Sequence, residues 1–170
     1  RKTIETPRVY LEESSVTATE NALILFSSLG QGIIENPARE PHVLTLIEFL
    51  RLMGAEIELH PLYYRIHQSP APQTDEINFR VPADYIDAGT IAIASAVTGG
   101  EVELNGIQNE EFSPIQHIFE RFGLTFEHTS PDSLKVLTSE LNNPSKITAG
   151  LWPSFPTDLV SLAIVLATQG

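Results

Sequence analysis

The 170-residue sequence contains no cysteine. Disulfide bonds, thiolate metal sites and a cysteine nucleophile are therefore excluded within these residues. The purely apolar stretches are short, so we expect no membrane-spanning segment. The start, RKTIETPRVY, lacks both an initiator methionine and the apolar core of a signal peptide. We therefore expect a cytoplasmic location and a piece of a longer protein.

Basic residues are also scarce. Ten lysines and arginines stand against 22 aspartates and glutamates, which gives a formal net charge of −12 at pH 7. Because no basic stripe is present to neutralise phosphates, nucleic acid is not an expected partner. An anionic substrate would need a cationic clamp supplied by other parts of a larger protein. The hydrophobic content of 42% is ordinary for a folded domain, so the charge imbalance does not indicate disorder.

The histidines and glycines match no metal or phosphate motif. No HExxH pair or other paired ligand spacing is present, so we expect surface or strand-edge histidines, no metal and no cofactor. Gly30-Gln31-Gly32 follows a predicted helix, whereas phosphate-binding glycine loops precede one, so it is interpreted as a helix end. The five histidines are His42, His60, His67, His117 and His128.

The sequence repeats itself. The stretch IEFLRLMGAEIEL has a helical pattern that ends at Gly54, and IQHIFERFGLTFEH has one that ends at Gly123, 69 residues later. In both, apolar residues recur at spacings of three and four, which predicts an amphipathic helix followed by a strand. Three other segments, ATENALILFSSLG, DAGTIAIASAVTG and DLVSLAIVLATQG, share one length and predict helices with little polar face.

These repeats predict an α/β fold of βαβαββ units in an incomplete array. Strands are expected at residues 8–12, 32–35, 56–59, 63–67, 77–81, 101–105, 125–128, 134–138 and 146–148. Helices are expected at residues 17–29, 41–53, 85–97, 114–122 and 158–168. We also expect a proline-rich loop at residues 67–76 and a helix start at Ser113-Pro114.

Three predicted strand-to-helix junctions carry polar residues that suit either a structural or a ligand-binding role. SSVTATEN, around Ser15, is interpreted as a helix N-cap or as a phosphate site at a helix start. ENPAREP contains Arg39 and Glu40, which form either a surface pair or part of a site. FPTD provides Thr157 or Asp158 as a helix cap, or Asp158 as a catalytic carboxylate. Because repeated α/β units usually hold ligands at such junctions, the three together favour a site.

At these residues the sequence resembles the enolpyruvyl transferase family, in particular its members that act on UDP-N-acetylglucosamine. SVTATEN, ENPAREP and FPTD occur in the family's order and at its separations, and FLRLMGAEIE and DAGTIAIASAVTGGEVEL fit the same pattern. The resemblance runs from about Arg8 to Gly170 and covers well under half of such an enzyme.

The resemblance implies an inside-out α/β barrel in each of two domains, with three repeated units, helices buried inside and sheets outside. Residues 1–81 would form part of the first domain and residues 82–170 part of the second, joined at a hinge strand. The remainder of the parent chain would then be a partner of this segment. Alone, the segment is expected to expose apolar helices, to self-associate and to lack activity.

The implied activity moves the enolpyruvyl group of phosphoenolpyruvate to the 3-hydroxyl of UDP-N-acetylglucosamine and releases phosphate. It serves peptidoglycan precursor synthesis, and through the cell wall it serves cell shape, cell cycle and cell division. Asp158 matches the general base at the sugar hydroxyl, where it also binds substrate. Glu40 matches a glutamate of the phosphoenolpyruvate-side network. Ser15 and Val16 match residues that contact the nucleotide-sugar diphosphate.

The sequence also departs from the family pattern. Glu13 stands where a lysine is expected and Thr17 where a glycine is expected, while Tyr85 replaces a common hinge arginine and Trp152 enlarges the loop before FPTD. An anion beside a diphosphate repels it. Two alternatives therefore stay open, a sister enolpyruvyl transferase that uses shikimate 3-phosphate and a non-catalytic ligand-binding paralogue.

Overall fold

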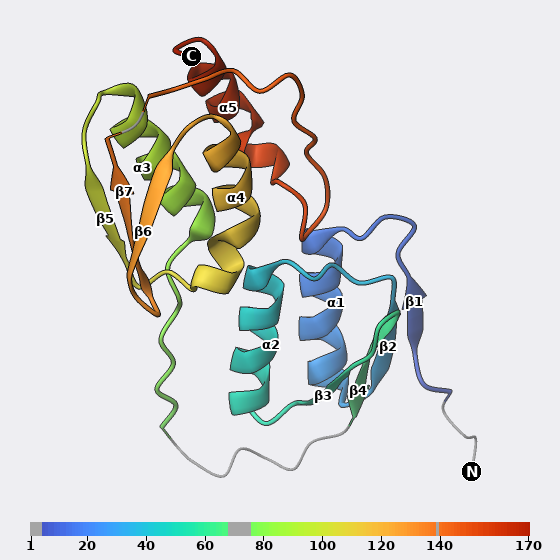
Figure 1. The fold of residues 1–170 in the computed structure, drawn as a ribbon. Helices are drawn as coiled ribbons and strands as arrows, with labels where there is room; N and C mark the ends of the chain where they lie inside the picture. The colour runs from blue at the N-terminus through green and yellow to red at the C-terminus, as the bar shows by residue number, and fades with distance from the viewer. Residues whose placement is uncertain (1–4, 68–75, 139) are drawn as a thin grey trace. The chain divides into compact units, whose positions relative to one another are not determined.

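The computed structural model describes residues 5–67, 76–138 and 140–170. Helices and strands alternate along the chain, so the protein is mixed α/β, as the sequence predicts (Figure 1). The chain divides into two units, Arg1–Val81 and Pro82–Gly170, and each has its own hydrophobic core. None of the helices in the described ranges has the length and apolar character needed to cross a bilayer.

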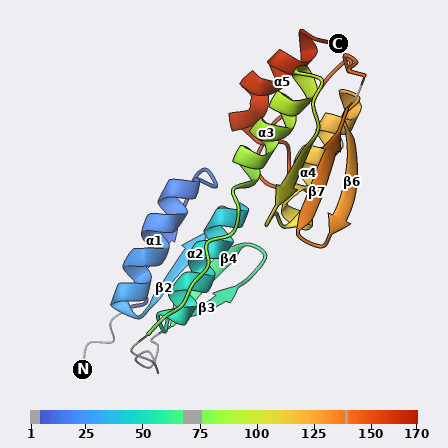
Figure 2. The same cartoon turned by 90° about the vertical axis from the view of Figure 1, so that its left-hand side faces the viewer.

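The first unit is a four-stranded sheet with two helices on one face. Its elements are β1 (Arg8–Tyr10), α1 (Val16–Leu29), β2 (Gly32–Glu35), α2 (Pro41–Leu52), β3 (Glu56–Leu59) and β4 (Tyr63–His67). The strands lie in the order β1-β2-β4-β3, where β1 is parallel to β2 and the other neighbours are antiparallel. Figures 1 and 2 show α1 and α2 side by side over the same face of this sheet.

Alternation along the strands explains why the helices cover only one face. Successive side chains of a strand point to opposite faces. Ile34 and Tyr64 point to the helices and are 0% exposed, as is Leu23 of α1, which packs in the same core. The opposite face carries charged residues, and an ion pair of 2.6 Å joins Arg8 Nη1 to Glu35 Oε1 across β1 and β2. The apolar face of the sheet thus fixes where the helices pack.

The second unit contains a three-stranded antiparallel sheet and three helices. Its elements are α3 (Tyr85–Val97), β5 (Val102–Asn105), α4 (Asn109–Arg121), β6 (Thr125–Ser130), β7 (Ser133–Leu137), the 3₁₀ turn η1 (Thr157–Leu159) and α5 (Val160–Ala167). The strand order is β5-β7-β6. Helix α3 packs against α4, α5 and the sheet, which places it at the centre of the core.

The second sheet repeats three strands of the first. Its order β5-β7-β6 matches β2-β4-β3, and the neighbouring strands are antiparallel in both. The buried cross-strand pair Ile34–Tyr64 of the first sheet corresponds to the buried pair Leu104–Leu134 of the second, 70 residues later. The sequence repeat therefore corresponds to a repeated arrangement of strands and helices.

Two predicted strands do not form within the described ranges. Residues 77–81 have no partner strand, and the ring of Phe79 instead lies 5.3 Å from the ring of Phe49 in α2. Residues 146–148 are also irregular, and the carbonyl of Lys146 accepts a hydrogen bond from the Arg121 guanidinium. A side chain thus occupies a backbone group that a strand ladder would use.

Helix α4 begins five residues earlier than predicted. The prediction placed its start at Ser113-Pro114, but the N-cap is Gln108 and the helix runs from Asn109, with Pro114 inside it. A proline within a helix forfeits one backbone hydrogen bond. The extra turn buries Phe112, which is 0% exposed, and this burial offsets the loss.

The C-terminal helix also differs from its prediction. The turn η1 precedes α5, so Asp158 lies in a 3₁₀ turn and not in the α-helix expected at residues 158–168. Of the loop expected at residues 67–76, residues 68–75 lie outside the described ranges.

Helices α2 and α4 are both followed by a glycine with a left-handed backbone, as the repeat predicts. The φ angles of Gly54 and Gly123 are 99° and 95°, a region that side chains disfavour. A Cβ atom on Gly123 would also lie 2.3 Å from the carbonyl oxygen of Glu140. A Cβ atom on Gly99, whose φ is 67°, would meet no atom within 4 Å. Gly123 is thus required for both conformation and space.

We predict that Gly123→Ala lowers the free energy of unfolding of the second unit by about 3 kcal/mol. Gly99→Ala is the matched control and should cost only about 1–2 kcal/mol, the strain of a left-handed alanine. Urea unfolding followed by the fluorescence of Trp152, the single tryptophan and a residue of this unit, measures both. Equal losses for the two variants would contradict the close contact with Glu140.

Candidate functional site

The start of α1 is capped by Ser15. Its backbone is extended (φ −73°, ψ 125°), and its Oγ accepts a hydrogen bond from the N–H of Ala18 at 3.3 Å. The cap interpretation is therefore confirmed for Ser15, and Val16 is the first helical residue. Ser14 has a different partner, since its Oγ donates to Asn36 Oδ1 at 2.9 Å. Because the first N–H groups of a helix have no intrahelical acceptor, this end of α1 retains donors for a ligand.

Asn36 joins the segment before α1 to the turn that follows β3. Its backbone is left-handed (φ 55°), which asparagine tolerates better than most residues. Its Nδ2 donates to the carbonyl of Leu11 at 2.9 Å, and its N–H donates to the carbonyl of Leu62 at 2.9 Å. Sequence reasoning missed this residue, although the Asn-Pro pair in ENPAREP is a turn signal.

Thr19 connects the start of α1 to the segment before α2. Its side chain is 0% exposed. Its Oγ1 donates to the carbonyl of Ser15 at 2.8 Å and accepts from the N–H of Ala38 at 2.9 Å. The sequence placed Thr19 in the cap region, but its bond to Ala38 depends on how the strands pair, so no local pattern reveals it. Through this bond the structure brings Ser15, Val16 and Glu40 into one connected region.

Glu40 is the residue before α2, and its carboxylate is held by the backbone. It makes no side-chain cap bond to the helix; its Oε2 accepts from the N–H of Arg39 at 2.9 Å. The Arg39 guanidinium donates to the carbonyls of His60 and Pro61, each at 2.5 Å, in the turn between β3 and β4. Arg39 and Glu40 thus bond to backbone groups, and not to each other as the surface ion pair that one interpretation expected.

Tyr64 lies beneath this segment. Its side chain is 0% exposed, its Oη donates to the carbonyl of Ala38 at 3.0 Å, and the Arg39 guanidinium lies 5.6 Å from its ring centre. Burial raises the pKa of Tyr64, Arg39 opposes this rise, and Glu40 adds to it. Sequence reasoning treated Tyr64 only as a strand residue. A tyrosine at a buried strand position could have indicated such a bond, since a buried tyrosine hydroxyl usually has a hydrogen-bond partner.

Asp158 lies exposed in η1 of the second unit. The interpretation of Thr157 or Asp158 as a helix cap is wrong, because η1 starts without a side-chain cap hydrogen bond. The turn is anchored on both sides: Leu159 is 0% exposed, and Phe155, 3% exposed, forms an isolated bridge with Ala149. Asp158 is therefore an exposed carboxylate on a fixed turn.

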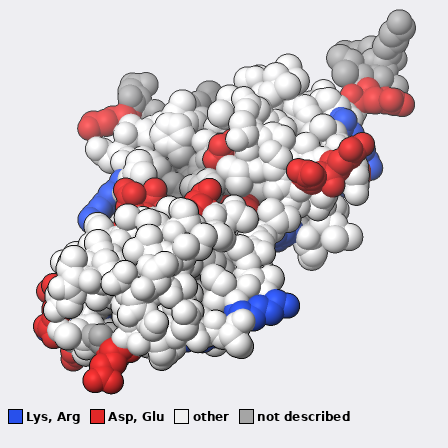
Figure 3. All heavy atoms as spheres, turned by 90° about the horizontal axis from the view of Figure 1, so that it is seen from above, with Lys and Arg blue, Asp and Glu red and all other residues white. Residues whose placement is uncertain are grey.

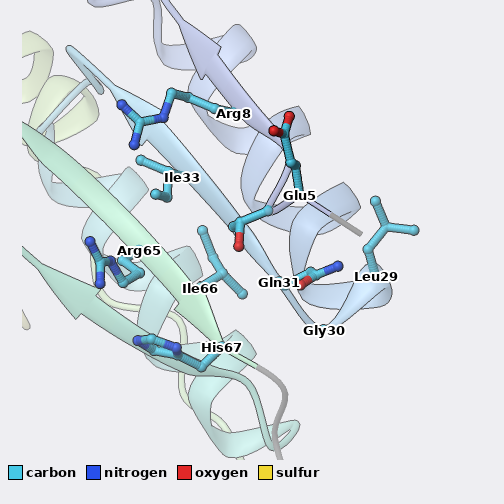
Figure 4. A pocket seen from close by; sticks show the side chains of 10 residues that line it. Glu5, Arg8, Leu29, Gly30, Gln31, Ile33, Arg65, Ile66 and His67 are labelled. Atoms are coloured by element: carbon cyan, nitrogen blue, oxygen red, sulfur yellow. The ribbon is translucent and has the colours of Figure 1, made fainter. Parts of the chain in front are cut away.

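A pocket of about 780 Å³ lies at the other end of α1 (Figure 4). The helix has 14 residues, so this pocket is about 20 Å along its axis from Ser15. None of the predicted site residues is among those that line it. The lining residues are Glu5, Thr6, Arg8, Leu29, Gly30, Gln31, Ile33, Arg65, Ile66 and His67.

The surface charge follows the composition. On the face shown in Figure 3, acidic side chains are spread widely and the basic ones do not gather into a patch. Within the described ranges, no three histidine or acidic side chains form a group able to hold a metal ion. The candidate site of the first unit contains hydroxyls, backbone N–H groups and the Glu40 carboxylate, with Arg39 next to it in the chain.

Comparison with solved structures identifies the fold. The crystal structure of the enolpyruvyl transferase NikO from Streptomyces tendae matches 99% of this chain with a TM-score of 0.75. The match covers 43% of the NikO chain, and the sequences are 15% identical, so this likeness concerns the fold. The chain therefore has part of the fold of an enolpyruvyl transferase.

Sequence comparison identifies the family. The chain belongs to the EPSP synthase (3-phosphoshikimate 1-carboxyvinyltransferase) family, whose model matches residues 2–169. Relatives named UDP-N-acetylglucosamine 1-carboxyvinyltransferase are 38% identical in Borrelia garinii and 36% identical in Bradyrhizobium diazoefficiens, in each case over 95% of this chain. The chain spans 39% of the length of both relatives. The resemblance seen in the motifs is confirmed.

We predict that Tyr64 loses its proton at a higher pH than a free tyrosine, whose pKa is about 10. Because folding raises the pKa, the stability that Tyr64 contributes is full below the unfolded-state pKa and is lost as pH rises through the folded-state pKa. Alkaline titration of phenolate absorbance should lose one component that titrates above the free-tyrosine range in Tyr64→Phe. Tyr63→Phe, on the opposite face of β4, is the control; loss of the same component there would contradict the assignment.

Proposed function

We propose that this chain is part of an enolpyruvyl transferase that moves the enolpyruvyl group of phosphoenolpyruvate to the 3-hydroxyl of UDP-N-acetylglucosamine and releases phosphate. The observation that carries the proposal is the 38% identity, over 95% of this chain, to a relative with that name. The reaction would belong to peptidoglycan precursor synthesis, in the cytoplasm. Acceptor-dependent phosphate release by the full-length parent tests it, and the absence of release with this acceptor contradicts it.

The proposed whole is a two-domain protein in which residues 1–81 and 82–170 belong to different domains. Each domain would be an inside-out α/β barrel with its helices inside. Apolar side chains on the helices support this arrangement, because several are exposed in the described chain: Ile24 by 52%, Leu25 by 53% and Ile164 by 59%. Helices from the rest of the parent would cover them.

Ser15 and Val16 are proposed to hold the diphosphate of the nucleotide sugar. A helix start suits an anion, because free N–H groups and the positive end of the helix dipole both point to it. Ser15 caps the N–H of Ala18 with its Oγ, and the N–H groups of Val16 and Thr17 have no intrahelical acceptor. Glu13, which is exposed two residues before Ser15, opposes an anion here, so the cations that balance it would come from the rest of the parent.

Glu40 is proposed to belong to the network around phosphoenolpyruvate. The bond from the Arg39 N–H fixes one oxygen of its carboxylate and leaves the other for a ligand or a proton. Its link to Ser15 through Thr19 and Ala38 supports a single site that holds both substrates.

Asp158 is proposed as the general base. The 3-hydroxyl oxygen attacks carbon 2 of phosphoenolpyruvate while its proton passes to a base and carbon 3 gains a proton. The tetrahedral intermediate then loses phosphate and a proton from carbon 3, which restores the double bond. A carboxylate that is exposed in one unit, and enclosed when two domains close on the substrates, suits the first proton transfer.

A second candidate is the sister reaction with shikimate 3-phosphate as acceptor. The description of the matching family model favours it, since that model is named for 3-phosphoshikimate 1-carboxyvinyltransferase. Phosphate release by the full-length parent with each acceptor in turn separates the two candidates. Tight binding of the nucleotide sugar without turnover would instead favour the non-catalytic paralogue that Glu13 suggests.

We predict that Asp158→Asn in the full-length parent lowers turnover by about two to four orders of magnitude, the usual contribution of a positioned general base. The fold should be retained, because the side chain is exposed and caps no helix. Asp132→Asn, an equally exposed aspartate of the same unit, is the control and should turn over normally. Steady-state phosphate release measures both, and unchanged turnover of Asp158→Asn would reject the base assignment.

We predict that the isolated 170-residue chain catalyses no enolpyruvyl transfer. It spans 39% of the relatives' length and carries 10 basic against 22 acidic residues, so it lacks the cations that phosphoenolpyruvate needs. Its exposed apolar helices should also make it self-associate. Phosphate release and light scattering on the purified chain are the measurements. Acceptor-dependent turnover by a monomer would place the whole active site within these residues and contradict the proposal.

A further inference from the structure

The direction of the Glu40 carboxylate depends on one peptide group. The peptide between Ala38 and Arg39 donates its N–H to Glu40 Oε2 at 2.9 Å. Its carbonyl accepts from Tyr64 Oη at 3.0 Å. Because a peptide is planar, its C=O and N–H turn together. The Tyr64 hydroxyl therefore sets the direction in which the N–H meets Glu40.

The preceding peptide group is anchored by a second buried hydroxyl. The N–H of Ala38 donates to Thr19 Oγ1 at 2.9 Å, and Thr19 in turn donates to the carbonyl of Ser15 at 2.8 Å. Thr19 is 0% exposed and Ala38 is 1% exposed, so water does not replace these bonds. Both backbone polar groups of Ala38 are thus bonded to side chains that the core holds in place.

We propose that Tyr64 and Thr19 are positioning residues for the transfer reaction, which act by orienting the Glu40 carboxylate through the backbone of Ala38. The proposal rests on the proposed function, in which Glu40 belongs to the active site. Tyr64 and Thr19 are fully buried and do not contact substrate themselves. Their hydroxyls provide the rigid support that a reactive carboxylate needs to stay within a small fraction of an ångström of its working position.

Loss of either hydroxyl has a defined structural consequence. Tyr64→Phe leaves the carbonyl of Ala38 without its donor, and a buried backbone group without a partner is unfavourable. The peptide then rotates toward another donor, which moves the Arg39 N–H away from Glu40. The phenyl ring still fills the core and still lies under the Arg39 guanidinium, so the change is confined to the hydroxyl.

A double-mutant cycle in the full-length parent tests the proposal. We expect Tyr64→Phe to lower kcat about tenfold to a hundredfold, the effect of a slightly misplaced reacting group, and to leave the KM for the nucleotide sugar nearly unchanged. In the Glu40→Gln background, Tyr64→Phe should have no further effect, because it acts only through that carboxylate. Multiplied losses in the double variant would overturn the proposal, as would a normal kcat for Tyr64→Phe alone.

Variants of Thr19 test the proposal independently, because one removes the hydroxyl and another keeps it. Thr19→Val removes the hydroxyl at nearly constant volume and should lower kcat, whereas Thr19→Ser keeps the hydroxyl and should restore it. Thr90→Val is the matched control, because Thr90 makes the same bond to the residue four positions earlier, at 3.0 Å to Ile86, within α3 of the other unit. Equal losses of kcat for Thr19→Val and Thr19→Ser, or for Thr19→Val and Thr90→Val, would overturn a role for the hydroxyl.

Hydrogen–deuterium exchange separates failure of this proposal from failure of the proposed function. Exchange at the Ala38 and Arg39 amides without substrates should be faster in Tyr64→Phe and Thr19→Val than in the parent, and unchanged in Tyr63→Phe. Unchanged exchange in the first two variants overturns the anchoring, whatever the activity. If exchange is faster in these two variants while the unaltered parent releases no phosphate with either acceptor, the anchoring is supported and the proposed function is rejected instead.

Discussion

The burial of one face of each sheet determines the rest of the structure. In β3 and β4 the buried side chains of Ile57, Tyr64 and Ile66 alternate with more exposed ones, so one face packs against helices. Two apolar helices fill that face in the first unit, and the starts of these helices then lie beside the loops that follow the strands. The polar residues of the candidate site lie at these starts, where helix N–H groups are free to bind other partners.

The candidate site also depends on the core in a more specific way. Thr19 and Tyr64 are buried among apolar side chains, yet each directs its hydroxyl to the backbone of Ala38. The segment that carries Glu40 is therefore bonded to the core through two side chains. These bonds fix its backbone although the segment itself is not part of a helix or strand. Buried hydrogen bonds of this kind resist exchange with water and hold their geometry.

Local sequence patterns predicted much of the fold but not how distant residues meet. The strands at residues 32–35, 56–59 and 63–67 and the helix Tyr85–Val97 form with the predicted bounds, and apolar residues alternate with polar ones at 56–59. The strand expected at residues 77–81 has a similar period without a partner, which one sequence cannot reveal. Motif resemblance selected Ser15, Val16, Glu40 and Asp158, but the bonds among Thr19, Ala38 and Tyr64 required the register of β2 with β4. That register is known only from the three-dimensional structure.

Because the two units share a strand order, equivalent positions in them can be compared. Leu134, opposite Leu104, occupies in the second sheet the position that Tyr64 occupies opposite Ile34 in the first. Tyr64 and Leu134 are both 0% exposed. Thr19 likewise corresponds to Ala88, 69 residues later and 5% exposed. The second unit thus has the same strand order with apolar residues at both places. Within the described ranges, only the first unit therefore holds the segment after its second strand with two side-chain hydroxyls, at the backbone of Ala38.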